Sequence, residues 1–247
     1  MLVGGGIVVR HGVAGAKSYK IVIVTKGENI DVFQDVDTGG GVAAKELGDT
    51  FSHTGPSTPG AAGQRDIIVN NLIPTHPDAI GVSANDPQVL GSALAQARAK
   101  GIKGFTWDSD VTPSDRSIFV NQVSSQVVGA TLARMACHDV PHCRGQIAIL
   151  SAFTTSTNQN AWIKFMKQAL QTSAKYRGLT LVATVYGNDL NGKSTTEAQG
   201  LLRRFPNLKA IVAPTSVGIT AAAKVVQDRH LTGKVDVTGL GLSLIHI

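Results

Sequence analysis

Short β-rich segments alternate with helical segments along this 247-residue chain, and this alternation constrains the fold more than any other feature. Segments rich in Val, Ile and other strand-forming residues predict buried strands. They cover residues 19–25, 78–83, 103–107, 146–150, 179–186, 209–213 and 235–238, with weaker candidates at 50–53 and 118–121. Between them, residues such as Leu90, Ala93, Leu94 and Ala97 follow the spacing of one helix face. The pattern predicts βαβ units with parallel sheets covered by helices on both faces.

The number of predicted strands indicates two sheets rather than one, because the chain is longer than a typical single domain. We therefore expect an α/β protein with two doubly wound parallel-sheet lobes. We assign residues 18–110 to the N-terminal lobe, the polar stretch 111–117 to a hinge crossover, and 118–236 to the C-terminal lobe. Residues 1–17 are glycine-rich, with an A-x-A-like sequence, and are treated as a signal remnant or a disordered segment.

One predicted helix contains an unfavourable run of glycines. Gly39, Gly40 and Gly41 follow one another in the helical segment after the first strand. Each glycine costs about 1 kcal/mol relative to alanine in a helix interior. This helix must therefore be held by tertiary packing, or it breaks at the glycines.

Composition excludes several classes of function. The formal net charge is +6, but Lys and Arg are spread along the chain without a basic run, so we expect no nucleic-acid partner. No apolar run approaches the about 20 residues that span a bilayer. The two cysteines, Cys137 and Cys143, flank a segment with His138 and His142. This segment lacks zinc-finger spacing, so we expect no metal site; whether the cysteines pair is left open.

Polar residues gather where the predicted strands end. In open α/β sheets, ligands bind beyond the carboxyl ends of the strands. Planar amides and carboxylates at these positions suit the adjacent hydroxyls of a monosaccharide, and aromatic rings suit its C–H face. Singly, such residues are also common as turn formers, helix caps or core. The candidate ligand-binding residues are Lys26, Phe33, Trp107, Asp108, Asn158, Gln159, Pro214 and Ser216.

Signatures of common enzymes are missing from the sequence. There is no G-x-S-x-G elbow, no G-x-x-x-x-G-K-[ST] phosphate loop and no G-x-G-x-x-G after the first strand. The histidines avoid most strand ends, so no Ser/His/Asp set suggests itself. We predict a protein that is not an enzyme and needs no cofactor.

Several segments at these strand ends, in order along the chain, carry a family resemblance. From about residue 20 to residue 242 the sequence resembles the type I periplasmic sugar-binding proteins of ABC importers, and within them the rhamnose-binding and autoinducer-2-binding branch. The matching segments are AAKELG (43–48), TGPSTP (54–59), VSANDP (82–87), TWDSD (106–110), TNQNAW (157–162), IVAPTSVGITAAA (211–223) and VTGLGL (237–242).

The resemblance implies two lobes that close on a ligand, with contacts from Lys26, Asp108, Asn158 with Gln159, Pro214 and Ser216. The autoinducer branch has a carboxylate where this chain has the amide of Asn158, which favours a deoxyhexose such as rhamnose. The family continues well past VTGLGL, whereas only residues 243–247 follow here. We therefore expect residues 237–247 to be a return hinge with a truncated tail, and the first lobe to lack its C-terminal elements.

The resemblance also implies the function. We expect a periplasmic or otherwise extracytoplasmic solute-binding protein, a monomer that captures a monosaccharide and delivers it to the permease of an ABC importer. The alternatives are an autoinducer-2 receptor of the same fold and the ligand-sensing core of a sugar-responsive transcription repressor. The repressor would need an N-terminal helix-turn-helix, and residues 1–17 are too short for one.

Overall fold

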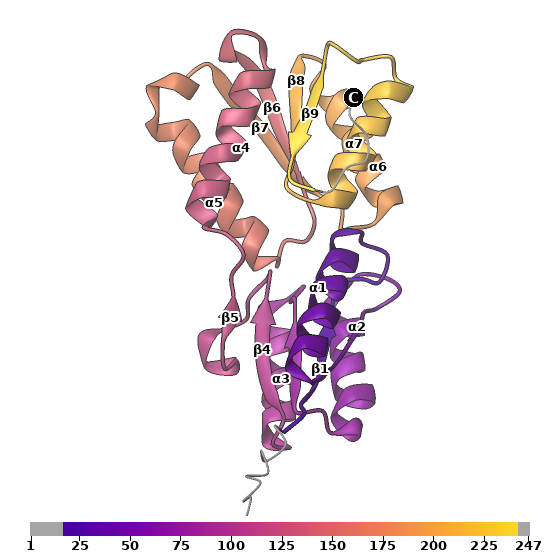
Figure 1. The fold of residues 1–247 in the computed structure, drawn as a ribbon. Coiled ribbons are helices and arrows are strands. Elements are labelled where there is room, and N and C mark those ends of the chain that lie inside the picture. Colours follow the sequence, from indigo (N-terminus) through magenta and orange to yellow (C-terminus); the bar gives the residue numbers. More distant parts are fainter. Residues whose placement is uncertain (1–16, 242–247) are drawn as a thin grey trace, which may run out of the picture.

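Two α/β lobes follow one another along the chain (Figure 1). The computed structural model describes residues 17–241. The predictions for the N-terminal segment before Lys17 and for the tail after Gly241 lie outside these residues. In Figure 1 the first lobe lies below the second, and the chain passes between them close to β5.

Both sheets are parallel throughout, and all nine predicted strands form. The first sheet has the order β2-β1-β3-β4-β5, and the second has the order β7-β6-β8-β9. The strands of the first sheet are β1 Lys20–Val24, β2 Thr50–Thr54, β3 Ala79–Val82, β4 Lys103–Trp107 and β5 Phe119–Val120. Those of the second are β6 Gly145–Ser151, β7 Leu179–Tyr186, β8 Leu208–Ala213 and β9 Asp236–Gly239.

Helices connect the strands, as the sequence pattern predicts. In the first lobe they are α1 Val32–Leu47, α2 Ala61–Asp66 with its continuations Ile67–Leu72 and Ile73–Thr75, and α3 Pro87–Ala99. In the second lobe they are α4 Ser125–Asp139, α5 Thr157–Thr172, α6 Asn191–Arg204 and α7 Ser216–Asp228. Single turns lie at Pro113–Asp115, Pro141–Cys143 and Ala174–Tyr176.

Two boundaries differ from those expected from the sequence. The prediction placed residues 118–236 in the second lobe, but Phe119 and Val120 pair with β4 of the first sheet. The chain therefore crosses after β5, just before α4. The prediction also began the return hinge at residue 237, whereas β9 pairs with β8 as far as Gly239. In both cases backbone pairing across the sheet, which no local pattern reveals, decides the boundary.

The glycine run does not break α1. This helix continues through Gly39, Gly40 and Gly41, and it packs beside β2. A Cβ atom on Gly40 would lie 2.3 Å from the ring of Phe51. The missing side chain thus lets the helix approach the sheet closely, and this packing offsets the low helix propensity of glycine.

The second sheet is buried on both faces. Ile147 and Ile149 are fully buried in a cluster with side chains of α4 and α5. Ala148 and Leu150, which alternate with them along β6, are fully buried in a second cluster with α6 and α7. Each face therefore has a complete helical cover, as expected for a doubly wound sheet.

The first sheet is covered unevenly. On one face, side chains such as Val82 are completely buried in a cluster with residues of α3 and of the segment after α2. On the other face α1 leaves Phe51 and Phe105 partly exposed. An apolar groove of about 520 Å³ lies there, lined by these rings and by residues of α1 and β5, including Val120. The α1 face of the first sheet is therefore covered less completely than the α3 face.

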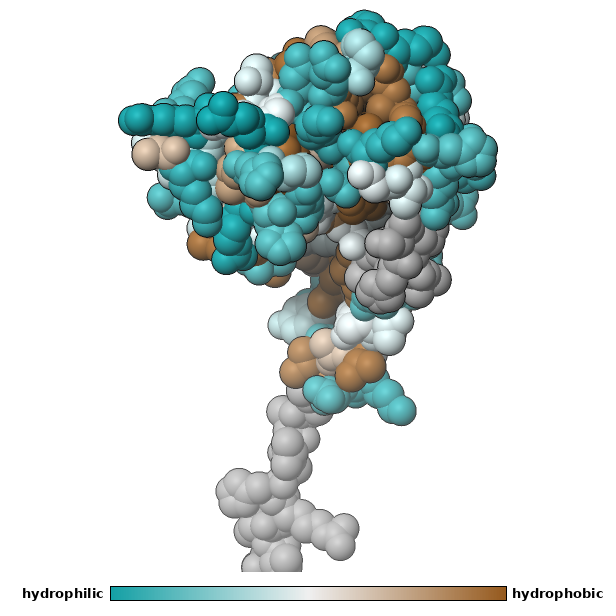
Figure 2. Space-filling model, turned by 90° about the horizontal axis from the view of Figure 1, so that it is seen from above, coloured by the Kyte–Doolittle hydropathy of each residue, from teal (hydrophilic) through white to brown (hydrophobic). Residues whose placement is uncertain are grey.

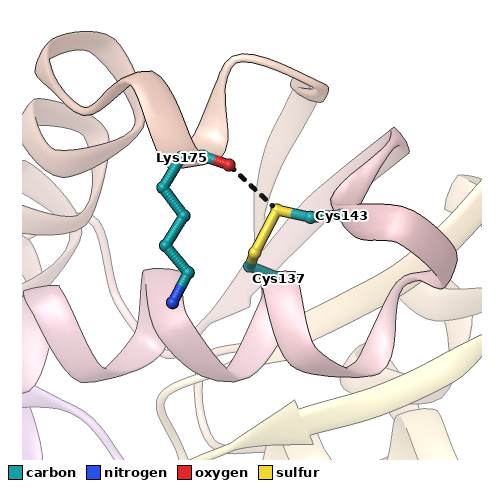
Figure 3. Close-up of a disulfide and its surroundings, with 3 residues drawn as sticks. All are labelled: Cys137, Cys143 and Lys175. Carbon is teal, nitrogen blue, oxygen red and sulfur yellow. Dashed lines mark hydrogen bonds between the residues drawn. A yellow bond between two sulfur atoms is a disulfide. The ribbon is translucent and has the colours of Figure 1, made fainter.

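A disulfide joins Cys137 to Cys143, a pairing that the sequence left open. Cys137 lies in the last turn of α4, and Cys143 lies in the turn that leads to β6 (Figure 3). The Sγ atom of Cys143 lies 3.4 Å from the carbonyl oxygen of Lys175. The bond thus closes a short loop at the edge of the second lobe.

Replacing both cysteines by serine is expected to lower the free energy of unfolding by about 2 kcal/mol. In the chain-entropy model, this is roughly what cross-linking a loop of so few residues contributes. Urea unfolding of the oxidised protein and of the double variant measures the difference. Reductant should lower the urea midpoint of the parent chain but leave that of the variant unchanged. Equal midpoints for the oxidised parent and the variant would contradict the prediction.

Candidate functional site

A cavity of about 170 Å³ lies between the lobes, at the carboxyl ends of strands from both sheets. Seven of the eight predicted site residues line it: Lys26, Phe33, Asp108, Asn158, Gln159, Pro214 and Ser216. The first three belong to the first lobe and the other four to the second. Parallel strands present their carboxyl ends at one edge, so two facing lobes bring both sets of strand-end residues together.

Lys26 and Asp108 form an ion pair on the first-lobe side of the cavity. Lys26 follows β1 and Asp108 follows β4, and the Nζ atom lies 3.1 Å from Oδ2 of the carboxylate. The lysine side chain is only 3% exposed. Burial opposes ionisation of Asp108, but the charge of Lys26 and hydrogen bonds from Ser83, Lys26 and Gln122 lower its pKa. Asp108 is therefore a carboxylate at neutral pH.

Asn158 connects this ion pair to the second lobe. It lies in the first turn of α5, and its Nδ2 donates to Oδ1 of Asp108 over 2.8 Å. Its Oδ1 accepts from Nζ of Lys26 over 3.4 Å. One amide therefore bonds to both members of the ion pair across the gap between the lobes.

Gln159 is held rigidly beside Asn158. Its Oε1 accepts hydrogen bonds from Oγ of Ser151 over 2.6 Å and from the backbone N–H of Ala152 over 2.9 Å. Its Nε2 has no hydrogen-bond acceptor within residues 17–241. Because the residue lines the cavity, this N–H₂ group is a donor available to a ligand.

Trp107 is the predicted site residue that the structure does not bring to the cavity. Its ring packs edge-on against Phe33, with centroids 5.4 Å apart, in a small apolar cluster with Ile23 and Ile30. Phe33, in the first turn of α1, lies between Trp107 and the cavity space. The side chain of Trp107 points to the α1 face of the sheet. It therefore packs against the side of Phe33 that faces away from the cavity.

Gln122 and Asp189 are among the cavity residues that the sequence reasoning did not select. Gln122 donates from Nε2 to Oδ1 of Asp108 over 2.9 Å. No local signal marks it, because it follows the two-residue strand β5, which was assigned to the other lobe. Asp189 lies just after β7 and bonds to the hydroxyl of Thr215. Its place after a strand was visible in the sequence, but nothing distinguished it from an ordinary turn former.

Asp189 differs from Asp108 in its electrostatics. Burial raises the pKa of Asp189, and the nearby charge of Asp108 adds to the rise, while Thr215 and Lys26 oppose it. A carboxyl whose pKa is higher in the folded state than in the unfolded state stabilises the fold at low pH. That contribution is lost as pH rises through the folded-state pKa. The carboxylate form of Asp189 is therefore less favourable in the closed cavity than the neutral form.

Asp189→Asn is expected to raise the free energy of unfolding at neutral pH. Asparagine keeps an acceptor for Thr215 and tolerates the left-handed backbone at this position, where φ is 49°. The gain over the parent chain should shrink as pH falls through the folded-state pKa of Asp189, because both side chains are then neutral. Urea unfolding at a series of pH values from neutral to acidic tests this; a gain independent of pH would contradict it.

Further hydrogen bonds hold the lobes against each other beside the cavity. The hydroxyl of Thr157 accepts from the backbone N–H of Asp110 over 2.9 Å and donates to the carbonyl of the same residue over 3.0 Å. The hydroxyl of Thr155 donates to the carbonyl of Asn85 over 2.6 Å. The structure thus shows the two lobes in direct contact through the loops at their strand ends.

The sequence profile described as "Periplasmic binding protein domain" matches residues 21–247. This is nearly the whole chain, and it includes both sheets, except for the first residue of β1, and all of the cavity residues. The chain belongs to this family. Periplasmic binding proteins work outside the cytoplasm, and they bind their substrates rather than transform them.

Solved structures of ABC-transporter solute-binding proteins have the same fold. One from Clostridium phytofermentas, with bound L-rhamnose, is 36% identical with a TM-score of 0.87; the match covers 92% of this chain and 70% of that one. One from Burkholderia graminis, with D-arabinose, is 30% identical with a TM-score of 0.79, covering 91% and 76%. LsrB from Clostridium saccharobutylicum, in complex with AI-2, is 22% identical with a TM-score of 0.84, covering 90% and 70%.

Two features are absent from the residues that the structure describes. None of the helices between Lys17 and Gly241 is both long enough and apolar enough to cross a membrane. The same residues contain no group of three or more His, Cys, Asp or Glu side chains that would hold a metal ion. Seen from above, the surface carries mostly hydrophilic side chains, with hydrophobic ones in a few patches (Figure 2).

Proposed function

We propose that this chain is the sugar receptor of an ABC importer and that it captures L-rhamnose, or a similar deoxyhexose, between its lobes. The observation that carries the proposal is the convergence of Lys26 and Asp108 from one lobe with Asn158 and Gln159 from the other. The 36% identity to a rhamnose-bound solute-binding protein supports the choice of sugar.

The chemistry of the cavity suits vicinal hydroxyl groups. A sugar hydroxyl donates one hydrogen bond and accepts others. Asp108 is an acceptor and Lys26 a donor, only 3.1 Å apart, so two adjacent hydroxyls can bond to them in place of their hydrogen bonds with Asn158. The free N–H₂ of Gln159 offers a further donor from the second lobe. Phe33 and Pro214 provide apolar surface for the C–H groups and the methyl group of a deoxyhexose.

Binding at this place couples the ligand to closure of the lobes. A sugar that bonds to Asp108 and Gln159 together stabilises the closed arrangement over an open one, because only the closed form presents both sides. We propose that the closed receptor acts as an extracytoplasmic monomer and presents both lobes to the membrane permease, which then takes the sugar.

A thermal-shift panel of monosaccharides tests the proposal. The chain is mixed with L-rhamnose, L-fucose, D-arabinose, D-glucose and D-galactose, and with autoinducer-2 as a separate arm. We expect the largest rise in Tm with L-rhamnose, since a ligand that binds only the folded state stabilises it. A rise in Tm with autoinducer-2 alone would identify autoinducer-2, and not a sugar, as the ligand. No rise with any compound would refute the receptor function.

A further inference from the structure

We infer that the site continues outward into a second sugar subsite, so that the receptor also accepts a disaccharide or glycoside whose terminal sugar is the one bound in the inner cavity. This inference rests on the proposed function and extends it. Its basis is a second cavity of about 320 Å³ between the lobes, which shares Ile30, Asp189 and Ser216 with the inner one. The two cavities therefore adjoin each other, and Asp189 lines both of them.

The outer cavity is built by both lobes. Asn29 and Asp31 from the loop before α1, and Ser57 from the loop after β2, face it from the first lobe. Asn191 at the start of α6 and Thr220 on α7 face it from the second. A ligand that fills both cavities would therefore still bridge the lobes and favour the closed form.

Its lining has the mixed character that carbohydrates need. The side chains of Asn29, Asp31 and Ser57 make no hydrogen bond to other side chains or to the backbone within the described part of the chain, so their donors and acceptors remain available. Pro59 and Val217 add apolar surface between these polar groups. Amides, a carboxylate and hydroxyls beside apolar patches match a ring with hydroxyls at its edge and C–H bonds on its face.

Asp189 would contact the bond between the two sugars or the hydroxyl next to it, because it borders both cavities. The inner residues Lys26 and Asp108 lie away from the outer cavity and would hold the terminal sugar alone. The inner cavity thus selects the terminal sugar, and the outer one accommodates what is linked to it.

Titration calorimetry of the 247-residue chain tests the inference. The ligands are L-rhamnose, methyl α-L-rhamnopyranoside and a disaccharide of rhamnose linked to glucose. We expect the disaccharide to bind at least about fivefold more tightly than the methyl glycoside, since one or two added hydrogen bonds contribute this much. In a variant combining Asn29→Ala and Asn191→Ala, the ratio of the two affinities should fall to about one.

The possible results separate the second subsite from the receptor function. Binding of rhamnose and its methyl glycoside with no gain for the disaccharide overturns the second subsite and leaves the receptor function standing. A gain that persists in the double variant also overturns it, because the added contacts then lie elsewhere. If no ligand binds, both the subsite and the receptor function fail.

Discussion

Asp108→Asn is expected to weaken monosaccharide binding by about a hundredfold. A hydrogen bond to a charged group contributes about 1.5–3 kcal/mol, and a loss of 1.4 kcal/mol is tenfold in affinity. The substitution also leaves the buried ammonium of Lys26 without its counter-charge, which it needs because its side chain is only 3% exposed. Calorimetry with L-rhamnose at a temperature where both proteins are folded measures the loss.

Asparagine is the informative replacement at this position. Asp108 has a φ of 56°, a left-handed conformation that asparagine tolerates and that strains alanine. Its amide can still accept one hydrogen bond, so the change isolates the charge. Asp228→Asn is the matched control, because this carboxylate on α7 is 60% exposed and lies outside the cavity. Equal affinity for the Asp108 variant and the parent would remove Asp108 from the ligand site.

The strands and the order of the lobes were predictable, because buried parallel strands are continuous apolar segments with their own local signal. The exact crossover was not. β5 has only two residues, and it belongs to the first sheet because Phe119 pairs with Thr106 of β4. Such a pairing joins residues on either side of a polar loop, so periodicity does not reveal it.

Part of the cavity was also predictable, because several of its residues lie just after strands that the sequence predicts. Lys26 and Asp108 follow strands closely, and Asn158 lies in the first turn of the helix after β6, so the strand-end rule finds all three. Gln122 reaches the cavity because it follows β5, whose carboxyl end lies beside that of β4 and hence beside Asp108. Trp107 precedes Asp108, yet its side chain turns to the α1 face and packs on Phe33. The rule locates a backbone position but not the direction of the side chain there.

A chain whose residues after Gly241 are replaced by the segment that the family resemblance implies beyond VTGLGL is expected to melt about 5 °C higher. Leu240 and Gly241 line the inner cavity together with Phe33, and Phe33 also lines the apolar groove, so the chain leaves the second lobe close to that groove. Burying a large apolar side chain contributes about 1.5–3 kcal/mol. Covering the remaining exposed part of Phe51 and Phe105 then gives about 1–2 kcal/mol, or roughly 5 °C.

Two lysine substitutions show whether the groove is what the extension covers. Val120 is 52% exposed and lines the groove, while Val127 is 58% exposed and does not. In the 247-residue chain, Val120→Lys and Val127→Lys should each change the free energy of unfolding by about 0.5 kcal/mol or less. In the extended chain, Val120→Lys should remove much of the gain in Tm, because its charge would then be buried, and Val127→Lys should not. An extended chain whose gain survives Val120→Lys would place the added segment away from the groove, and the exposed face of the first sheet would then need another explanation.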